Sequence, residues 1–283
     1  MIAFHLHLVS DSTGETIRSV ARACLVQFEE VTPTEHMWPM ARTARAIEQV
    51  IEDIAQHPGP VIFTIVDAAL RTQLLEACHR LKVPGIPVLD PVILAVGSYL
   101  GAQASGRPGR QHEMNAAYFR RIEAMDWSME HDDGQALSDL NQADVVLVGV
   151  SRTSKTPTSL YLGNQGMKAA NVPFVPGFGL PPELDTIEDT LIIGLNKDAR
   201  RLVETRRTRL LALHQDPSTA YVDLESVGAE VAEARRHFSR RGWPVIDVSR
   251  RSIEETAAEI MRMLLRRREQ ESDALVAEGS TDD

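Results

Sequence analysis

Short apolar runs alternate along this chain with segments whose apolar residues recur every three or four positions. The clearest run, VVLVGV at residues 145–150, is typical of a strand that is covered on both faces. Similar runs occupy residues 4–9, 60–67, 86–90, 170–175, 190–195 and 244–248. Helical spacing occupies residues 41–54, 70–81, 92–100, 114–129 and 197–214. Ser252 and Glu255 form a capping box before a last helical pattern, and the polar tail after Gln270 is expected to be frayed. Strands that alternate with helices indicate parallel sheets with helical crossovers, so we expect an α/β fold.

A glycine-rich interval interrupts the alternation. Residues 101–110, GAQASGRPGR, are typical of a linker or an exposed loop. The chain has 283 residues, which is long enough for two domains. We place the boundary after residue 105. The prediction is an N-terminal parallel-sheet α/β domain at 1–105, followed by a P-loop kinase-like α/β domain at 106–283.

The run at 145–150 leads into a segment that resembles a phosphate-binding loop. Gly149, Lys155 and Thr156 stand at the Walker A spacing, with Ser154 in place of the second glycine. In such a loop, backbone N–H groups and a helix N-terminus surround a phosphate, lysine adds a positive charge and the threonine hydroxyl reaches Mg²⁺. The predicted nucleotide-binding residues are Gly149, Val150, Ser151, Arg152, Thr153, Ser154, Lys155 and Thr156. An ordinary strand-to-helix turn with a surface lysine is the alternative.

Two polar segments precede this loop in the chain. SDSTGET, residues 10–16, follows the first predicted strand and suits an anion, but a cluster of helix N-cap residues is the favoured interpretation. HDDGQ, residues 131–135, contains Asp132 and Asp133, which are candidates for a general base or a metal site. A solvated turn around Gly134 explains HDDGQ equally well.

Other polar residues have weaker signals. The helix at 197–214 is rich in arginine and places some arginines near its buried side, which suits phosphate binding or an ordinary amphipathic helix. His5 and His7 share one strand face, where packing is favoured over metal binding because no third ligand is near in sequence. Asp67 ends a strand as a Walker B aspartate does, but it precedes the loop and ranks low.

Composition narrows the classes of function. The formal net charge of −10 argues against a nucleic-acid partner, which normally needs a basic face. No apolar run is long enough to span a membrane, and the N-terminus lacks the pattern of a signal peptide. Cys24 and Cys78 fall on apolar helical positions, as reduced core thiols do in cytoplasmic proteins. We therefore expect a cytoplasmic protein that binds neither membrane nor nucleic acid.

Together the motifs resemble the bacterial pyruvate, phosphate dikinase regulatory proteins and the related phosphoenolpyruvate synthase regulatory proteins. The resemblance covers residues 4–265 and rests on SDSTGET, HDDGQ, GVSRTSKTPTSLYL, ANVPFVP, WPVIDVSRRSIEETAAEI and the arginines of TRRTRL. It implies a bifunctional phosphotransferase. An ADP-dependent serine/threonine kinase inactivates the dikinase by phosphorylating a threonine. A phosphate-dependent phosphorylase then removes that phosphate with inorganic phosphate and forms diphosphate.

The resemblance also implies roles for residues. Lys155 and Mg²⁺ would hold the β-phosphate of ADP, with Thr156 on the metal. Asp132 or Asp133 would accept the threonine proton or hold the metal, and arginines of the basic helix would hold the second phosphate. Ser154 resembles a variant of the dikinase branch, which favours pyruvate, phosphate dikinase as the protein substrate, and a homodimer is expected. The alternatives are the same activity on phosphoenolpyruvate synthase, a P-loop kinase of a small metabolite, and a nucleotide sensor that transfers nothing.

Overall fold

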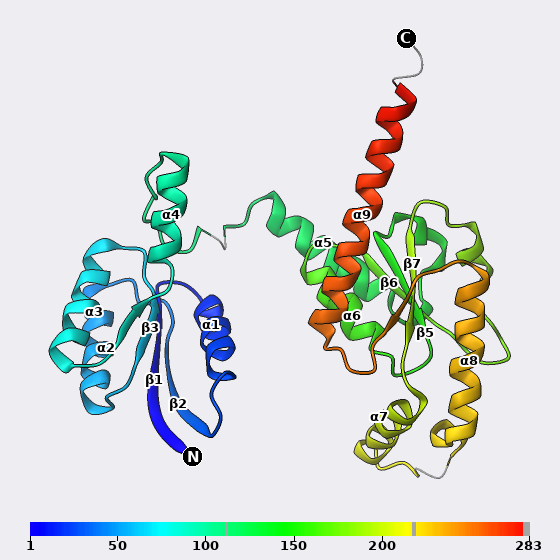
Figure 1. Ribbon diagram of the computed structural model, residues 1–283, viewed down its shortest axis with the longest axis horizontal. Helices are drawn as coiled ribbons and strands as arrows, with labels where there is room; N and C mark the ends of the chain where they lie inside the picture. Colours follow the sequence, from blue (N-terminus) through cyan, green and yellow to red (C-terminus); the bar gives the residue numbers. More distant parts are fainter. Residues whose placement is uncertain (111–112, 217–218, 280–283) are drawn as a thin grey trace. The chain divides into compact units, whose positions relative to one another are not determined.

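The computed structural model describes residues 1–110, 113–216 and 219–279. The chain forms two compact units, unit 1 (Met1–Glu113) and unit 2 (Met114–Asp283), each described here by itself (Figure 1). This division lies later in the chain than the expected boundary after residue 105. Each unit contains a four-stranded parallel sheet covered by helices. The predicted α/β fold class is confirmed.

Unit 1 is built on a sheet with the strand order β2-β1-β3-β4. Its strands are β1 (Ile2–Ser10), β2 (Val31–Trp38), β3 (Val61–Thr64) and β4 (Gly85–Pro87). Its helices are α1 (Glu15–Leu25), α2 (Ala44–Gln56), α3 (Ala68–Leu81) and α4 (Asp90–Leu100). Alternation along β1 sends Leu6 and Leu8 towards α1, whereas Val9 packs with α2 and α3 on the opposite face (Figure 1).

Unit 2 repeats this arrangement with the strand order β6-β5-β7-β8. Its strands are β5 (Val145–Gly149), β6 (Ala169–Pro173), β7 (Leu191–Asn196) and β8 (Val245–Asp247). Its α-helices are α5 (Ala116–Glu130), α6 (Lys155–Asn164), α7 (Ala199–Ala212), α8 (Leu224–Arg240) and α9 (Ile253–Gly279). Every residue of β5 is buried, as its β-branched run predicts, because α6 and α9 cover one face of the sheet and α7 and α8 the other.

The two sheets place their first strand in the same position. In both units the first strand lies between the second and third strands of that unit, so the chain leaves it towards one side and later returns on the other. Ligands of open α/β sheets bind at the carboxyl ends of the strands beside such a reversal. The segment after β5, which contains Lys155, begins at this point in unit 2.

Three elements differ from the sequence-based expectations. Strand β2 was not predicted, because it lies at the sheet edge, contains Pro33 and is partly exposed, so it lacks the apolar run of a central strand. Helix α8 was also not predicted. Helix α9 continues to Gly279, whereas a frayed tail was expected after Gln270; its Arg, Glu and Ala residues are strong helix formers.

The surface corrects the expectation for one thiol. Both cysteines are free, but only Cys78 is buried, whereas Cys24 is exposed on α1 near the point where that helix ends.

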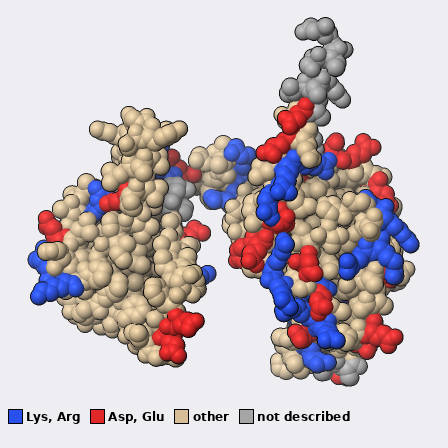
Figure 2. Space-filling view, viewed as in Figure 1, with Lys and Arg blue, Asp and Glu red and all other residues tan. Residues whose placement is uncertain are grey.

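Helix α4 carries the exposed apolar side chains Val92, Leu94, Val96, Tyr99 and Leu100. On the face shown in Figure 2, basic and acidic side chains are interspersed over unit 2. Within the described ranges, no helix is long and apolar enough to cross a membrane.

Candidate functional site in unit 2

The segment from Gly149 to Thr156 connects the end of β5 to the start of α6, which is the strand–loop–helix order of the motif. The loop turns tightly: the Thr153 hydroxyl donates a hydrogen bond to the Val150 carbonyl at 2.9 Å. A Cβ atom at Gly149 would lie 2.7 Å from the Thr153 Oγ1 and 2.8 Å from the Leu195 carbonyl oxygen. Only glycine therefore fits where the loop leaves the strand.

Ser154 caps the N-terminus of α6 in a left-handed backbone conformation, with φ of 64° and ψ of 25°. This is the position at which the Walker A pattern has its second glycine. Glycine adopts left-handed φ values without a steric penalty, which explains the usual preference there. Serine occupies the same backbone geometry, so the substitution preserves the path of the loop.

Lys155 is buried, with 6% of its surface exposed, and its Nζ donates a hydrogen bond to the Val150 carbonyl at 3.2 Å. Burial lowers the pKa of Lys155 to about 8, although the carboxylates of Asp133 and Asp132 act in the opposite direction. The lysine thus carries its charge in a poorly solvated position. A negatively charged ligand beside it would stabilise that charge.

A cavity of about 480 Å³ opens over this loop. Its walls come from the segment after α5, from the loop and first turn of α6, from the end of β6 and from α7. The lining residues are Asp132, Asp133, Ser151, Arg152, Ser154, Lys155, Thr156, Pro157, Pro173, Val175 and Thr205. The structure therefore brings together the three predicted catalytic residues and the predicted metal ligand, Thr156. A volume of this order suits a small organic ligand with phosphate groups.

Asn171, on β6, organises the two carboxylates. Its side-chain Nδ2 donates to the carboxylate of Asp132, and its Oδ1 accepts a hydrogen bond of 3.1 Å from the backbone N–H of Asp133. Asp133 has a left-handed φ of 55°. Across the described parts of the chain, the Asp133 carboxylate accepts no hydrogen bond, so it is available to a ligand. Sequence reasoning missed Asn171, although a polar residue within the buried run AANVP was the signal.

The histidine of HDDGQ has a different environment from its carboxylates. His131 is buried and stacks on Trp127, and its Nδ1–H donates to the Trp127 carbonyl at 2.8 Å. Its Nε2 lies 3.0 Å from the Asp139 carboxylate, and its own carbonyl accepts from the Asn171 backbone N–H at 3.1 Å. His131 therefore fixes the end of α5 against β6. HDDGQ is a turn, with Gly134 at a φ of 80° and with Asp133 and Gln135 exposed, and its two carboxylates line the cavity.

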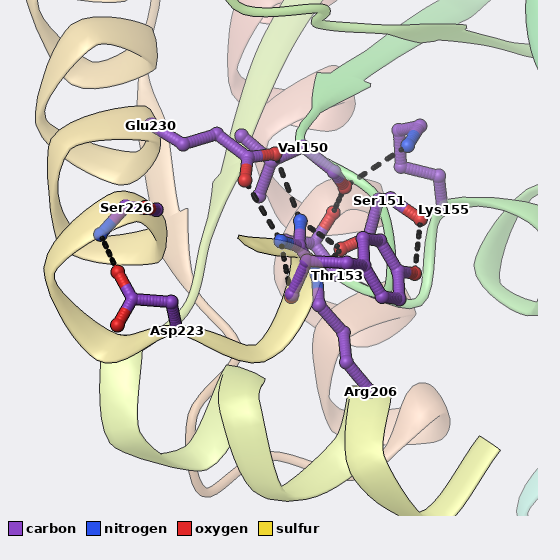
Figure 3. A network of polar contacts seen from close by, with 9 residues as sticks. Val150, Ser151, Thr153, Lys155, Arg206, Asp223, Ser226 and Glu230 are labelled. Carbon is purple, nitrogen blue, oxygen red and sulfur yellow. Dashed lines mark hydrogen bonds and ion pairs between the residues drawn. The ribbon is translucent and has the colours of Figure 1, made fainter. Parts of the chain in front are cut away.

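Arg206, on α7, holds the loop through the Ser151 carbonyl (Figure 3). Its buried guanidinium forms two hydrogen bonds of 2.8 Å with the Glu230 carboxylate and donates to the Ser151 carbonyl at 3.1 Å. It also lies 4.3 Å from the centre of the Tyr221 ring, whose hydroxyl is 3.0 Å from the Ser151 Oγ. The expected phosphate-binding role does not suit this arginine, because protein groups occupy its donors. The other α7 arginines, at 200, 201, 207 and 209, are exposed.

Two of the weaker candidates, Asp67 and SDSTGET, lie in unit 1. Asp67 is the N-cap of α3 and accepts from the Leu70 N–H at 3.0 Å, which accounts for it without a metal. The interpretation of SDSTGET as an N-cap cluster is wrong, because Gly14 is the cap of α1 and no side chain bonds there. Instead, Asp11 accepts from the Val66 N–H at 2.8 Å, and the Thr64 hydroxyl donates to Ser10 at 3.0 Å.

Comparison with known proteins shows the family of the chain. The family model described as kinase/pyrophosphorylase matches residues 6–261. The chain belongs to the kinase/pyrophosphorylase family. Relatives from Paramagnetospirillum magneticum and Rhizorhabdus wittichii are each 54% identical, over 92% and 93% of this chain and 84% and 96% of their own lengths. A relative from Caulobacter vibrioides is 52% identical over 92% of this chain and 83% of its own.

These relatives are named as pyruvate, phosphate dikinase regulatory proteins. The resemblance inferred from the motifs is therefore confirmed at the level of the family. Membership of the kinase/pyrophosphorylase family indicates that the chain is an enzyme of the phosphotransferase type. The matched range includes the whole loop from Gly149 to Thr156 and the carboxylates at 132 and 133.

Proposed function

We propose that the chain is a bifunctional enzyme that regulates pyruvate, phosphate dikinase. In one direction it transfers the β-phosphoryl group of ADP to a threonine of the dikinase and inactivates it. In the other it removes that phosphate by phosphorolysis with inorganic phosphate, forms diphosphate and restores the dikinase. The names of the relatives support the protein substrate, and the family description supports the two opposed reactions.

One observation carries the proposal: a buried lysine, a loop at a helix N-terminus and two carboxylates line a single cavity. Both reactions move a phosphoryl group between oxygen atoms, so the enzyme mainly positions the groups and neutralises charge. Lys155 and the N–H groups at the start of α6 supply positive potential for the transferred phosphoryl group. The same cradle serves both reactions, because the threonine oxygen receives the phosphoryl group in one and releases it in the other.

The two carboxylates, Asp132 and Asp133, act on the threonine hydroxyl that attacks the phosphoryl group. The unpaired Asp133 carboxylate is the better candidate to accept the proton of the threonine hydroxyl as that oxygen attacks phosphorus. Asp132 is held by Asn171 and keeps its second oxygen for a metal or for the substrate. In phosphorolysis the attacking oxygen belongs to inorganic phosphate, which is largely ionised near neutral pH and needs little help from a base. The proton that hydrogen phosphate still carries passes to the threonine oxygen as its bond to phosphorus breaks, and diphosphate forms.

The residues present also suit Mg²⁺. The Thr156 hydroxyl and the Asp132 and Asp133 carboxylates line one cavity, and oxygen ligands of this kind are those that Mg²⁺ prefers. When bound, the ion would neutralise charge on the phosphate oxygens. Lys155 neutralises charge independently of the metal.

The experiment uses ADP labelled in its β-phosphate, with labelled ATP in parallel, and purified dikinase. The proposal requires label on a dikinase threonine from ADP and not from ATP, and release of labelled diphosphate when inorganic phosphate is added. Label on a small molecule instead would identify a metabolite kinase, and binding without transfer would identify a sensor. Phosphoenolpyruvate synthase in place of the dikinase tests the second protein target.

We further propose that the enzyme acts in the cytoplasm as a homodimer. Its two free thiols suit a reducing compartment. The exposed apolar side chains of α4 provide a surface of the character that subunit contacts use. Sedimentation velocity of the full chain, with and without ADP, measures the assembly directly.

A further inference from the structure

Four histidines and one aspartate gather in unit 1, on the face of the sheet that α2 covers. His5 and His7 lie on β1, and His36 is paired with His7 across the neighbouring strand β2. Asp53 is in the last turn of α2, and His57 is the residue that ends this helix. The sequence places His5 and His7 on one face but not their partners, which lie some thirty to fifty residues further along.

Three of these side chains converge. The His36 Nδ1 lies 2.8 Å from the Asp53 Oδ2, and the His7 Nδ1 lies 3.5 Å from the same oxygen. One ligand atom from each of His7, His36 and Asp53 falls within 4.8 Å of the other two. Neighbouring ligand atoms around a tetrahedral zinc ion are about 3.3 Å apart, as bond lengths near 2.0–2.1 Å require. The two distances to the Asp53 Oδ2, 2.8 and 3.5 Å, lie on either side of this value.

Hydrogen-bond accounting leaves two atoms of the cluster without a partner. The His7 Nε2 is 2.8 Å from the His57 carbonyl oxygen, which only accepts, so the ring proton is on Nε2. In the neutral ring the Nδ1 then carries a lone pair, and it lies 3.5 Å from the Asp53 Oδ2, which also carries lone pairs. His7 is fully buried, and neither atom has a partner that meets hydrogen-bond geometry, although the His36 Nδ1 lies 2.8 Å from the Asp53 Oδ2. Buried lone pairs that face each other are costly unless a cation lies between them.

Each of the three side chains is also held on the side away from the cluster. His7 donates to the His57 carbonyl, and the His36 Nε2 lies 2.9 Å from the His5 Nδ1. The second oxygen of Asp53 lies 2.9 Å from the His57 Nδ1. Metal-binding histidines and carboxylates characteristically have such outer partners, which orient the ligand atom. His5 and His57 occupy the positions of those partners.

The backbone fixes this outer contact. A Cβ atom at Gly59 would overlap the His5 carbonyl oxygen, so glycine is required where the chain after α2 passes β1. That close approach keeps the His57 carbonyl against His7. His36 lies on an edge strand and is partly exposed, so it can withdraw from Asp53 by the roughly half an ångström that an ion needs.

We propose that His7, His36 and Asp53 bind one divalent transition-metal ion of the zinc type, with a fourth position open to water. Two imidazoles and a carboxylate are ligands that zinc accepts, and hard ions such as Mg²⁺ prefer oxygen alone. The ion joins the edge strand β2 to β1 and to α2. It belongs to unit 1 and is separate from the phosphate cavity around Lys155.

The test uses the full chain, freed of metal with a chelator and titrated with Zn²⁺ by calorimetry. We expect one high-affinity Zn²⁺ ion per chain. Asp53→Asn and His36→Gln should each weaken Zn²⁺ binding at least about 100-fold. His79→Gln, at an exposed histidine on α3, and the double variant Asp132→Asn, Asp133→Asn should leave the high-affinity site unchanged. Loss of binding in the double variant alone would assign the ion to the phosphate cavity and overturn the proposal.

A second measurement does not depend on variants. Co²⁺ in place of Zn²⁺ should give the intense visible absorption of a four-coordinate ion, and the NMR shifts of ¹⁵N-labelled histidines should show His7 and His36 bound through Nδ1. Octahedral Co²⁺, unchanged histidine shifts on addition of Zn²⁺, or equal Zn²⁺ affinity in the wild type and Asp53→Asn would overturn the proposal.

Discussion

The side-chain amide of Asn171 holds the carboxylate of Asp132 while also accepting from the backbone of the next residue. One side chain on a buried strand thus sets the position of both carboxylates relative to Lys155. Asn171→Ala should lower turnover about tenfold or more and destabilise the fold by roughly 1–3 kcal/mol, because the Asp133 N–H loses its acceptor and the Asp132 carboxylate loses its donor. Steady-state kinetics and thermal unfolding measure the two effects. Asn164→Ala, at an exposed residue of α6, is the control, and normal turnover in Asn171→Ala would contradict the positioning role.

Lys155 should lower the stability of the fold while it raises the rates of both reactions. Lys155→Met should lower the rates of both reactions about 10²–10³-fold, because one charge at the transition state is lost. The same change should stabilise the fold at pH 7 by roughly 1–3 kcal/mol, since it removes a buried charge whose pKa is lowered to about 8. Denaturant unfolding and single-turnover rates test this pair. Undiminished phosphorylation would exclude the phosphate-cradle assignment.

The lowered pKa of Lys155 also has a definite pH dependence. The unfolded chain keeps this lysine protonated to about pH 10.5, and the folded chain only to about pH 8. Between these values the unfolded state binds more protons, so the contribution of Lys155 to the free energy of unfolding increases with pH. A bound phosphate group should restore the lysine's charge. Calorimetry of ADP binding near pH 8, in buffers of different ionisation enthalpy, should therefore detect uptake of about half a proton.

Ser154 should be replaceable by glycine. Its left-handed backbone suits glycine, so Ser154→Gly should keep ADP affinity within about tenfold, or roughly 1.4 kcal/mol. Ser154→Ala keeps the strained backbone and removes only the hydroxyl. Calorimetry on both variants separates the two contributions. If both variants lost ADP binding, the hydroxyl itself would be a nucleotide contact.

The two carboxylates should respond differently to amide substitution. If Asp133 is a base, Asp133→Asn should slow phosphorylation of the dikinase far more than phosphorolysis. If Asp132 holds Mg²⁺, Asp132→Asn should slow both directions together, and added Mg²⁺ should restore part of each. Forward and reverse single-turnover rates measure these differences. Wild-type rates in both variants would remove these residues from the mechanism.

The apolar pattern of the sequence was sufficient for the central strands and most crossover helices, because burial on both faces requires long apolar runs. It was insufficient for β2, an edge strand with Pro33, whose polar residues contact solvent. The Ser252–Glu255 capping box was predicted and is present, with hydrogen bonds of 2.8 and 3.1 Å. Capping is local, and local contacts can be derived from spacing.

The residues of the candidate site also fall into those that the sequence pattern predicts and those that it does not. The loop around Lys155 is continuous in sequence and follows from its motif. Asn171, Arg206 and Glu230 reach it from other elements, and no spacing rule connects them. The cluster around Asp53 shows the limit most clearly, since tertiary packing alone places His36 beside His7. The distances between these side chains depend on which strands and helices pack together, and the spacing of residues in the sequence does not give that.

The contact between Arg206 and the Ser151 carbonyl has a kinetic consequence. Because this contact and the Thr153 hydrogen bond hold the loop before any nucleotide arrives, binding loses little conformational entropy in the protein. Association should then be limited by diffusion and electrostatic attraction rather than by a slow closing step. A nucleotide that binds at this loop should meet a rigid receptor, so dissociation rates, more than association rates, should differ between one nucleotide and another.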